Sequence, residues 1–431
     1  MNSTSKIFKI IFSIFFCIFL LFFPVICFSV AFEDNEILNY SDLEILSNEA
    51  SGLATSEPNI NAKHAIVLER NSNRILYGKL EFQKTPMAST TKIATALVVI
   101  QNESNLNKLV TVSKKASSIG GSRLGLKEND KITIKDLLFG LMLCSGNDAA
   151  ICLAENISGT LENFVYEMNL LAKQLNLKDT NFTSPHGLDN TNHYTTAYEL
   201  AVLTNYALSN KTFSKLVQTQ STTIHINSFP KSIKNTNELL GYYPGVYGVK
   251  TGFTNNAGRC LVTSTKQNNL DIITIVLGCD SKKLRTLDSL KLIKYVFSNF
   301  KLHDISEHLN KELRNLQGCF KVEKSNSIPI LRFVNSISTL PLTQTEYIGL
   351  KLSSTYNPTL SSKTSITEPI GHIIISYNNS VLKTVPFYLE NILVHKNLFD
   401  YYTEFLKFFT EICNRRIKKN YLIHNLLKIC V

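Results

Sequence analysis

The sequence predicts an α+β protein in which strands open the folded region, helices fill its middle and strands return late. Patterns typical of strands lie at residues 64–69, 74–77, 245–249, 259–266 and 270–278. Apolar stretches of helical length lie at residues 91–100, 134–157, 161–175, 196–208 and 284–300. This order favours a mainly antiparallel sheet whose first and last strands are neighbours, with helices packed on its faces.

A second pattern begins near residue 302 and predicts a separate small all-β, or at least β-rich, domain over residues 302–392. Apolar and polar residues alternate at 331–338, 346–352, 371–377 and 381–389. Turn residues such as Ser, Thr, Asn and Pro separate these short strands. The first folded domain is therefore expected to span residues 61–301.

The N-terminus predicts an export signal. Lys6 and Lys9 precede an apolar run over residues 10–28, and the small residues of Ser29-Val30-Ala31 follow. We expect a signal peptide over residues 1–31 with cleavage near Ala31. An uncleaved anchor is the alternative, because the run approaches the length of a spanning helix. Residues 32–60 are polar and acidic and predict a loosely ordered lead-in segment.

The C-terminal segment, residues 393–431, predicts a basic amphipathic helix. Apolar residues recur at helical spacing at Leu398, Tyr402, Phe405, Phe409 and Ile412. Charged residues oppose them, and Arg416, Lys418 and Lys419 add positive charge. Such a helix can lie in a membrane interface. The alternative is a terminal helix that docks on the protein's own surface.

Composition narrows the possible partners and cofactors. The formal net charge of +11 fits nucleic acid, an anionic cell wall or a membrane surface. No zinc-finger, homeodomain or RNA-binding signature accompanies the charge, so nucleic acid is not expected. Nine cysteines are present, two of them in the signal region. The other seven form no Cys-x-x-Cys pair, so neither a disulfide framework, a metal site nor a cofactor is predicted. Cys144 and Cys152 are expected to pack as small hydrophobes.

Three short motifs carry the chemistry. Ser89-Thr90-Thr91-Lys92 comes first, Ser145-Gly146-Asn147 begins 56 residues after Ser89, and Lys250-Thr251-Gly252 begins 161 residues after it. Each is weak alone: a serine before an apolar run can be a helix cap, and Ser, Gly and Asn favour turns. The ordered set indicates an active-serine acyltransferase.

Acyl transfer needs a nucleophile, a base, an acid for the leaving amine and donors for the oxyanion. Ser89 is the predicted nucleophile. Lys92 is the predicted base, since residues three apart share a helix face. Ser145 is a candidate proton shuttle, and Asn147 a candidate donor to the substrate's amide carbonyl.

The third motif predicts a carboxylate clamp at the edge of a late strand. The cation of Lys250 and the hydroxyl of Thr251 could hold a free carboxylate. Gly252 would leave room for the substrate to approach the strand backbone. A substrate with a free C-terminus is therefore expected.

Four blocks carry a family resemblance: residues 86–92 (PMASTTK), 145–150 (SGNDAA), 184–189 (SPHGLD) and 249–254 (VKTGFT). They resemble those of the low-molecular-mass penicillin-binding proteins that act as D-alanyl-D-alanine carboxypeptidases. The resemblance covers most of the chain. It implies a β-lactamase/transpeptidase-like catalytic domain, a small β-rich second domain and a C-terminal amphipathic anchor.

The resemblance also implies a reaction. Ser89 would be acylated by a peptidoglycan stem peptide ending in D-Ala-D-Ala, the terminal D-Ala would leave, and water would hydrolyse the acyl-enzyme. The backbone N–H groups of Ser89 and Phe253 would be the oxyanion donors. β-Lactam antibiotics would acylate Ser89 too. His186 would help to build a loop near the site. The protein would act outside the cytoplasmic membrane or in the cell wall, and would be secreted if the tail does not anchor.

Three other functions stay open. A class A serine β-lactamase would need a glutamate that activates water, and the nearest match to its Glu-x-x-Leu-Asn pattern is residues 167–171, which end in Leu171. A DD-endopeptidase of the same fold would cut crosslinks instead. A catalytically silent wall-binding membrane protein would have lost Ser89, Lys92 or Lys250, and all three are present.

Overall fold

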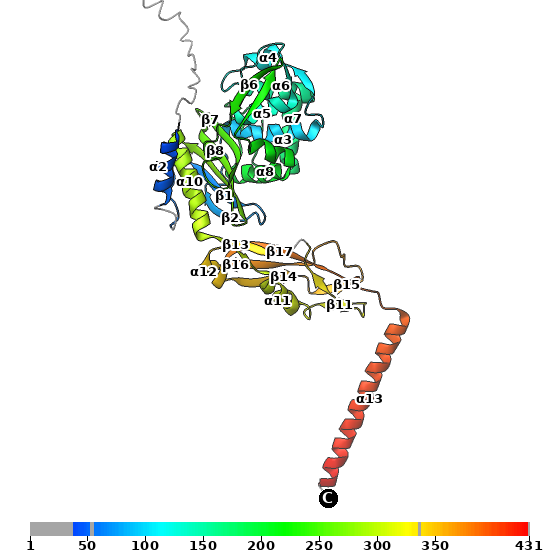
Figure 1. The fold of residues 1–431 in the computed structure, drawn as a ribbon. Coiled ribbons are helices and arrows are strands. Elements are labelled where there is room, and N and C mark those ends of the chain that lie inside the picture. The colour runs from blue at the N-terminus through cyan, green and yellow to red at the C-terminus, as the bar shows by residue number, and fades with distance from the viewer. Residues whose placement is uncertain (1–37, 52–55, 335–337, 430–431) are drawn as a thin grey trace, which may run out of the picture.

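The computed structural model describes residues 38–51, 56–334 and 338–429. Figure 1 shows a body of helices and sheet, a β-rich region beside it and a long C-terminal helix that projects away from both. The predicted signal peptide, residues 1–31, lies outside the described residues.

A five-stranded antiparallel sheet forms the centre of the body. Its order is β2-β1-β9-β8-β7. The strands are β1 (His64–Glu69), β2 (Ile75–Lys79), β7 (Val246–Thr254), β8 (Gly258–Gln267) and β9 (Leu270–Cys279). The first strand pairs with the last along its whole length, from His64 opposite Leu277 to Glu69 opposite Ile272. The prediction that the first and last strands are neighbours is therefore confirmed. Strand β7 lies at one edge of the sheet.

Helices cover both faces of this sheet (Figure 1). One face carries α2 (Tyr40–Ser51) and α10 (Lys282–Asn299). The expectation of a loosely ordered lead-in is wrong for residues 40–51, because α2 buries Leu43, Leu46 and Ala50 in the core shared with α10. The other face carries α3 (Lys92–Asn102), α5 (Ile134–Leu143), α6 (Asn147–Ser158), α7 (Leu161–Gln174), α8 (Ala197–Ser209) and α9 (Lys211–Val217).

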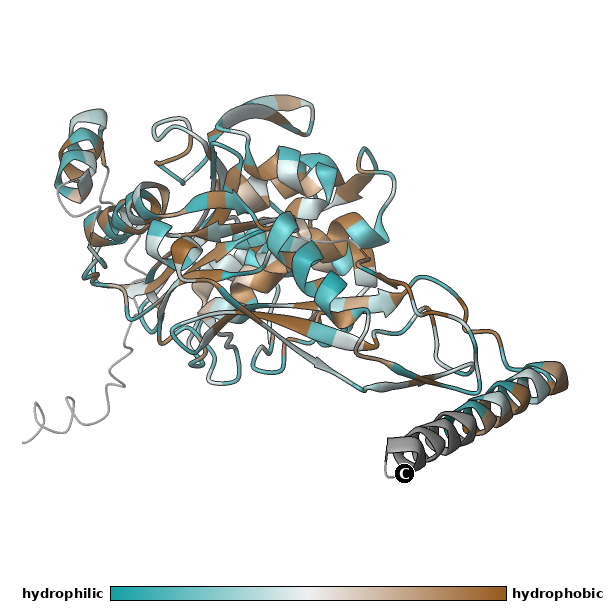
Figure 2. Cartoon of the chain, turned by 90° about the horizontal axis from the view of Figure 1, so that it is seen from below, coloured by the Kyte–Doolittle hydropathy of each residue, from teal (hydrophilic) through white to brown (hydrophobic). Residues whose placement is uncertain are grey.

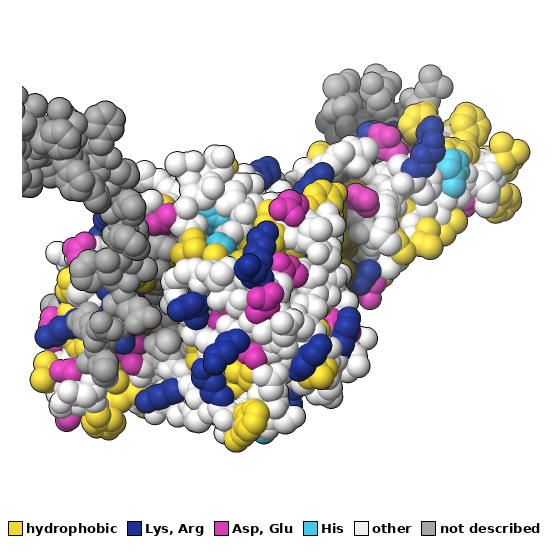
Figure 3. Space-filling model, turned by 90° about the horizontal axis from the view of Figure 1, so that it is seen from above, with side chains coloured by type: hydrophobic (Ala, Val, Ile, Leu, Met, Phe, Trp, Pro, Cys, Tyr) yellow, Lys and Arg dark blue, Asp and Glu magenta, His cyan; other side chains and the backbone are white. Residues whose placement is uncertain are grey.

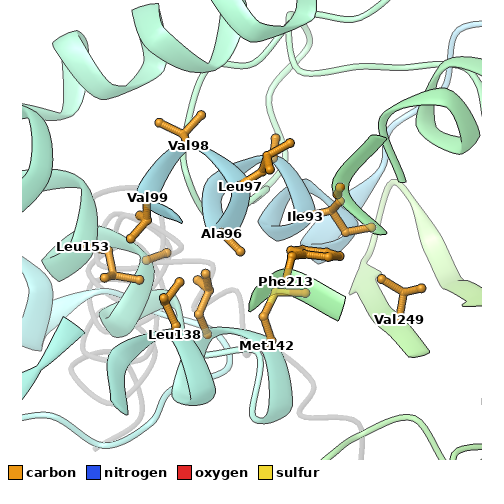
Figure 4. Close-up of a cluster of buried hydrophobic side chains, with 14 of the residues drawn as sticks. Ile93, Ala96, Leu97, Val98, Val99, Leu138, Met142, Leu153, Phe213 and Val249 are labelled. Carbon is orange, nitrogen blue, oxygen red and sulfur yellow. The ribbon is translucent and has the colours of Figure 1, made fainter. Parts of the chain in front are cut away.

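Helix α3 runs through the middle of the helical layer. Its residues from Lys92 to Val99 are all buried, as expected of a helix that is apolar on every side. Figure 4 shows Ala96 and Val99 of α3 on the side of the helix that faces Leu138 of α5 and Leu153 of α6. The start of α3 is thus held in a close-packed interior, where small displacements are costly.

The single helical pattern predicted over residues 134–157 is two helices in the structure. Helix α5 ends at Leu143 and α6 begins at Asn147. Ser145, between them, has a positive φ of 60°. The apolar pattern continues because both helices face the same core, so it does not reveal the break.

A peripheral four-stranded sheet and a short helix were not predicted. The sheet has the order β3-β4-β5-β6 and flanks the helical layer. These elements are β3 (Leu109–Thr111), α4 (Lys114–Ser118), β4 (Lys131–Thr133), β5 (Ser221–Ile226) and β6 (Phe229–Lys234). Their strands are short and their outer faces exposed, so they lack a long apolar alternation.

The region after α10 is rich in strands and has its own buried core. Three small sheets have the orders β12-β17-β16-β14, β10-β13 and β11-β15. Their strands are β10 (Lys301–Asp304), β11 (Lys321–Glu323), β12 (Leu331–Arg332), β13 (Thr339–Leu342), β14 (Lys351–Tyr356), β15 (Thr359–Ser361), β16 (Gly371–Tyr377) and β17 (Ser380–Leu389). The region also contains two helices that were not expected, α11 (Ser306–Leu316) and α12 (Gln344–Ile348).

The strand predicted at residues 346–352 is therefore wrong in its first half. Thr343 and Glu346 form a capping box that starts α12, and β14 begins only at Lys351. Reciprocal capping satisfies two backbone donors and favours a helical turn there.

Side chains connect the β-rich region to the body. The Arg74 guanidinium, from the turn between β1 and β2, donates to the Pro341 carbonyl and pairs with the Glu346 carboxylate. Lys383 donates to the Ser72 carbonyl from the other side of the junction. Arg74 is buried and has an ionic partner, as a buried charge requires.

The C-terminal helix, α13 (Leu398–Ile429), confirms the predicted helical tail. Figure 2 shows hydrophobic and hydrophilic residues alternating around its described turns. Large apolar side chains such as Leu398 and Phe405 are exposed. Within the described residues, no helix combines the length and the apolar character needed to cross a membrane.

Candidate active site

Ser89 lies in a 3-10 turn, η1 (Ala88–Thr91), that leads directly into α3. The helix-cap interpretation of Ser89 is wrong, because Met87 and Thr91 occupy the two N-cap positions and neither caps with its side chain. Ser89 is partly exposed, whereas Thr90 and Thr91 are buried. Ser89 is thus the partly exposed residue of a turn whose other residues are buried.

Lys92 Nζ lies among three oxygens. They are Ser89 Oγ at 2.7 Å, Asn147 Oδ1 at 2.7 Å and the His186 carbonyl at 3.0 Å. The first two motifs, far apart in sequence, therefore meet at one amine, which is fully buried.

The electrostatic setting favours the neutral form of Lys92. Burial lowers the pKa of its amine well below the usual range, and the nearby Lys250 charge lowers it further. A neutral amine has two hydrogens and one lone pair. Asn147 Oδ1 and the His186 carbonyl can accept only the hydrogens, so the lone pair is left for the Ser89 hydroxyl.

Asn147 and Ser145 lie at the break between α5 and α6. The Asn147 side chain donates from Nδ2 to the Gly120 carbonyl at 2.7 Å, while its Oδ1 contacts Lys92. Nδ2 carries two hydrogens, and Gly120 takes one of them. Ser145 is two residues before Asn147 and is almost fully buried. The carboxylate of Asp148 accepts from the backbone N–H groups of Leu124, Gly125 and Leu126, which ties this turn to the loop before it.

The third motif lies within β7, the edge strand. Lys250 Nζ donates to the Thr251 carbonyl at 2.9 Å, and the hydroxyls of Thr251 and Thr236 are 2.7 Å apart. Burial lowers the pKa of Lys250 to about 7. The two lysines of the motifs are both buried, and each is therefore easier to deprotonate than a surface lysine.

Gly252 brings β7 against the turn that holds Ser89. A Cβ at this position would lie 3.2 Å from the Ser89 nitrogen and 3.2 Å from the Thr90 nitrogen. On the side where a Cβ would point, the space is taken by the protein's own turn. The glycine is needed for that close approach.

Arg259 lies beside the third motif and was not predicted from the sequence. It lies on β8 opposite Phe253, and its guanidinium is 3.5 Å from the centre of the Phe253 ring. Cation–π stacking holds the guanidinium beside the end of the third motif. No local sequence signal identifies this arginine, since only strand pairing brings it there.

The block at residues 184–189 forms a loop that packs against both the η1 turn and β7. The Pro185 carbonyl accepts from Thr95 Oγ1 at 2.6 Å, and Asp189 Oδ1 accepts from Thr254 Oγ1 at 2.5 Å. Gly187 has a φ of +85°, and a Cβ there would lie 2.0 Å from the Ala88 carbonyl. The loop thus holds both the serine turn and the first turn of α3 in place.

His186 contributes its carbonyl to Lys92, while its ring Nδ1 accepts from the Leu188 N–H at 3.2 Å. Burial lowers the pKa of the imidazole to about 3. This arrangement agrees with the expectation that His186 builds the loop.

The position of Glu167 argues against the class A β-lactamase alternative. Glu167, the nearest match to the β-lactamase glutamate, accepts from Asn102 at the far end of α3. That end is about 15 Å from Lys92 along the helix axis. Among the described residues, no group of three or more His, Cys, Asp or Glu side chains is arranged to hold a metal ion.

Comparison with known proteins places the chain among named relatives. The family model described as D-alanyl-D-alanine carboxypeptidase, Peptidase S11, matches residues 51–281. The chain is 37% identical over 259 residues to D-alanyl-D-alanine carboxypeptidase DacF of Bacillus subtilis, covering 59% of this chain and 67% of the relative. It is 28% identical over 262 residues to the D-alanyl-D-alanine endopeptidase of Escherichia coli, covering 59% of this chain and 83% of the relative.

A solved structure resembles a larger part of the chain. Penicillin-binding protein 5 from Haemophilus influenzae superposes with a TM-score of 0.68 at 26% identity, covering 79% of this chain and 99% of that protein. The predicted β-lactamase/transpeptidase-like fold is confirmed. The family match covers more than half of the sequence and includes all three motifs. The chain therefore belongs to the Peptidase S11 family, the serine-type D-alanyl-D-alanine carboxypeptidases.

Proposed function

We propose that Ser89 is the nucleophile of this carboxypeptidase and that Lys92 is its base. One observation carries the proposal: Lys92 Nζ is 2.7 Å from Ser89 Oγ, while two fixed acceptors take its hydrogens. A buried amine with a depressed pKa can take the serine proton at neutral pH.

The reaction follows from these positions. Ser89 Oγ bonds to the carbonyl carbon of the penultimate D-Ala as its proton passes to Lys92. The peptide C–N bond then breaks, and the leaving amine of the terminal D-Ala receives a proton from Lys92, with Ser145 as the shuttle. Water hydrolyses the resulting ester. The backbone N–H groups of Ser89 and Phe253 are the proposed oxyanion donors.

The substrate we propose is a peptidoglycan stem peptide that ends in a free carboxylate. Asn147 would donate to the peptide's amide carbonyl through the second Nδ2 hydrogen. Lys250 and Thr251 would hold the terminal carboxylate, with the guanidinium of Arg259 adding positive charge at the same strand edge. β-Lactams, which also carry a carboxylate, would acylate the same serine.

Fluorescent penicillin tests the nucleophile. The purified protein without its signal should become covalently labelled, and the Ser89→Ala variant should not. Release of D-Ala from a pentapeptide, compared with cleavage of a crosslinked dimer, tests the choice between carboxypeptidase and endopeptidase. Equal labelling of both proteins, or faster cleavage of the dimer, would contradict the proposal.

We also propose the organisation of the exported protein. A signal peptide over residues 1–31 and a lead-in over residues 32–60, whose helix α2 packs on α10, precede a catalytic domain over residues 61–301. A β-rich domain over residues 302–392 and a membrane-associating tail over residues 393–431 follow. Separate buried cores before and after residue 301 support the boundary between the two domains. The enzyme would work at the outer face of the cytoplasmic membrane.

The tail's attachment rests on its exposed apolar side chains. Leu398, Phe405 and Phe409 are 89%, 61% and 56% exposed. They repeat at helical spacing and would enter a membrane interface on one side of α13. Truncation before Asn397 should abolish sedimentation with vesicles that contain anionic lipid. Unchanged sedimentation would rule out the tail as the anchor.

A further inference from the structure

Four branched aliphatic side chains are exposed together at the end of the β-rich region from which α13 leaves. Ile328 is 74% exposed, Ile330 43%, Ile392 67% and Val394 69%. These four residues are called the apical patch. Single exposed aliphatic residues are common on protein surfaces, but a group on adjoining segments marks an interaction site.

The two segments that carry the apical patch are fixed to each other. The Ile330 N–H donates to Asn391 Oδ1 at 2.8 Å, and Asn391 Nδ2 donates to the Ile328 carbonyl at 2.9 Å. The Val394 N–H donates to Ser327 Oγ at 3.0 Å. These side-chain bonds hold the two segments together beyond the paired residues Leu331 and Leu389 of β12 and β17.

The opposite side of the same ribbon is already occupied. Leu331, Leu389 and Leu393 are buried in the core of the β-rich region. The side chains of the apical patch therefore cannot turn inward without displacing this core, and they remain at the surface.

The apical patch continues into α13. Val394 is four residues before Leu398, and Lys396 between them pairs with Glu404 at 2.6 Å and lies 5.8 Å from the centre of the Tyr401 ring. These contacts hold the first turns of the helix beside the ribbon. Figure 3 shows hydrophobic side chains gathered at the right-hand end of the molecule, next to basic side chains.

The chemistry of this combined surface fits a lipid bilayer with anionic headgroups. Residues 396–419 contain six basic and three acidic side chains, which favours an anionic surface. Tyr401 and Tyr402 lie at the start of α13, and tyrosine and lysine are typical of the membrane–water interface.

We propose that the apical patch is a second membrane contact, which enters the interface of an anionic bilayer together with α13. This inference rests on the proposed attachment of α13. Two contacts joined by the Lys396–Glu404 pair fix how the β-rich region stands on the membrane. The catalytic body lies at the other end of that region, where Arg74 pairs with Glu346 (Figure 1).

The chain contains no tryptophan, so the fluorescence of a single introduced tryptophan reports on the surroundings of that position alone. Ile392→Trp places the probe in the apical patch. Ile348→Trp is the matched control: Ile348 is 76% exposed on α12, at the end of the β-rich region that meets the catalytic body. Both variants are made in the full chain without its signal. The vesicles contain equal parts of phosphatidylcholine and phosphatidylglycerol.

We expect both variants to sediment with the vesicles. Only Ile392→Trp should shift its emission to shorter wavelength and be quenched by brominated lipids. In a second experiment, the triple variant I328S/I392S/V394S should bind vesicles about tenfold more weakly, because it loses three apolar contacts. The double variant I348S/V381S should bind like the parent, and equal penicillin labelling would show that both are folded.

The possible outcomes distinguish failure of the second membrane contact from failure of the tail attachment and of the catalytic proposal. Normal sedimentation with unchanged Ile392→Trp emission would overturn the second contact alone. Absence of sedimentation would overturn the tail attachment as well, while penicillin labelling would still test the catalytic proposal. A blue shift of Ile392→Trp that depends on protein concentration without vesicles would assign the apical patch to a second copy of the chain, and would overturn the membrane contact.

Discussion

His193 Nε2 lies 2.7 Å from Thr91 Oγ1, and so joins the loop before α8 to the turn that carries Ser89. The tautomer follows from the other ring nitrogen, because Nδ1 accepts from the Thr183 N–H at 3.0 Å. Nε2 therefore carries the hydrogen and donates to Thr91, whose hydroxyl donates in turn to the Ala88 carbonyl at 2.7 Å. Burial lowers the pKa of His193 to about 4, which keeps the ring neutral near pH 7.

Replacing this histidine should slow acylation without removing the nucleophile. His193→Ala breaks the bonds to Thr91 and Thr183 and leaves the Thr183 N–H without its acceptor and the Thr91 hydroxyl oxygen without its donor, so we expect acylation by penicillin to slow about tenfold or more. His193→Gln can still donate to Thr91 and should recover part of the rate. Stopped-flow labelling measures both, and thermal melting monitors folding. Equal rates for the Ala and Gln variants at equal stability would argue against a positioning role.

Removing the amine of Lys92 should have a much larger effect. Lys92→Met keeps roughly the volume of the side chain but supplies no base, so the rate of acylation should fall by about 10²–10⁴-fold. The measurement is the rate of covalent labelling at saturating penicillin. Circular dichroism serves as the folding control. A folded variant that labels at the parent's rate would remove Lys92 from the mechanism.

The two buried lysines predict a bell-shaped pH dependence of kcat/KM. Lys92 must be neutral to act as a base, and protonation on the acid side should reduce acylation. Lys250 must be charged to hold a carboxylate. Its pKa of about 7 means that this charge is present below pH 7 and is lost as the pH rises through that value.

We therefore expect an alkaline fall with a midpoint about pH 7, seen mainly in KM for a peptide with a free C-terminus. A peptide with an amidated C-terminus provides the control, because it has no carboxylate for Lys250 to hold. If both peptides show the same alkaline limb, the carboxylate clamp is wrong. A profile for the Lys250→Met variant should lack that limb.

Gly252 offers a test of the close approach between β7 and η1. A Cβ at 3.2 Å from the Ser89 and Thr90 nitrogens must push the strand or the turn by a few tenths of an ångström. Gly252→Ala should slow acylation about tenfold through this displacement. Gly318→Ala is the control, because a Cβ there meets nothing within 4 Å. The idea fails if both variants label like the parent.

The sequence by itself determined the chemistry and much of the architecture. Ser89 and Lys92 could be paired without a structure, because two residues that are three positions apart on a helical turn lie on the same face. The antiparallel sheet was predicted because strand patterns open the folded region and return after the helical middle. The helical tail was also readable, since its apolar residues recur at helical spacing.

Tertiary structure decided how distant motifs meet. The contact of Asn147 with Lys92, the Arg259–Phe253 stack and the His193–Thr91 bond join residues that are close only after folding. The break at Ser145 also escaped detection, because α5 and α6 bury the same apolar pattern on both sides of it. Local periodicity shows which face of a segment is buried, whereas the surroundings of the proposed base and the proposed clamp, and the pKa values of their lysines, depend on which segments share the interior.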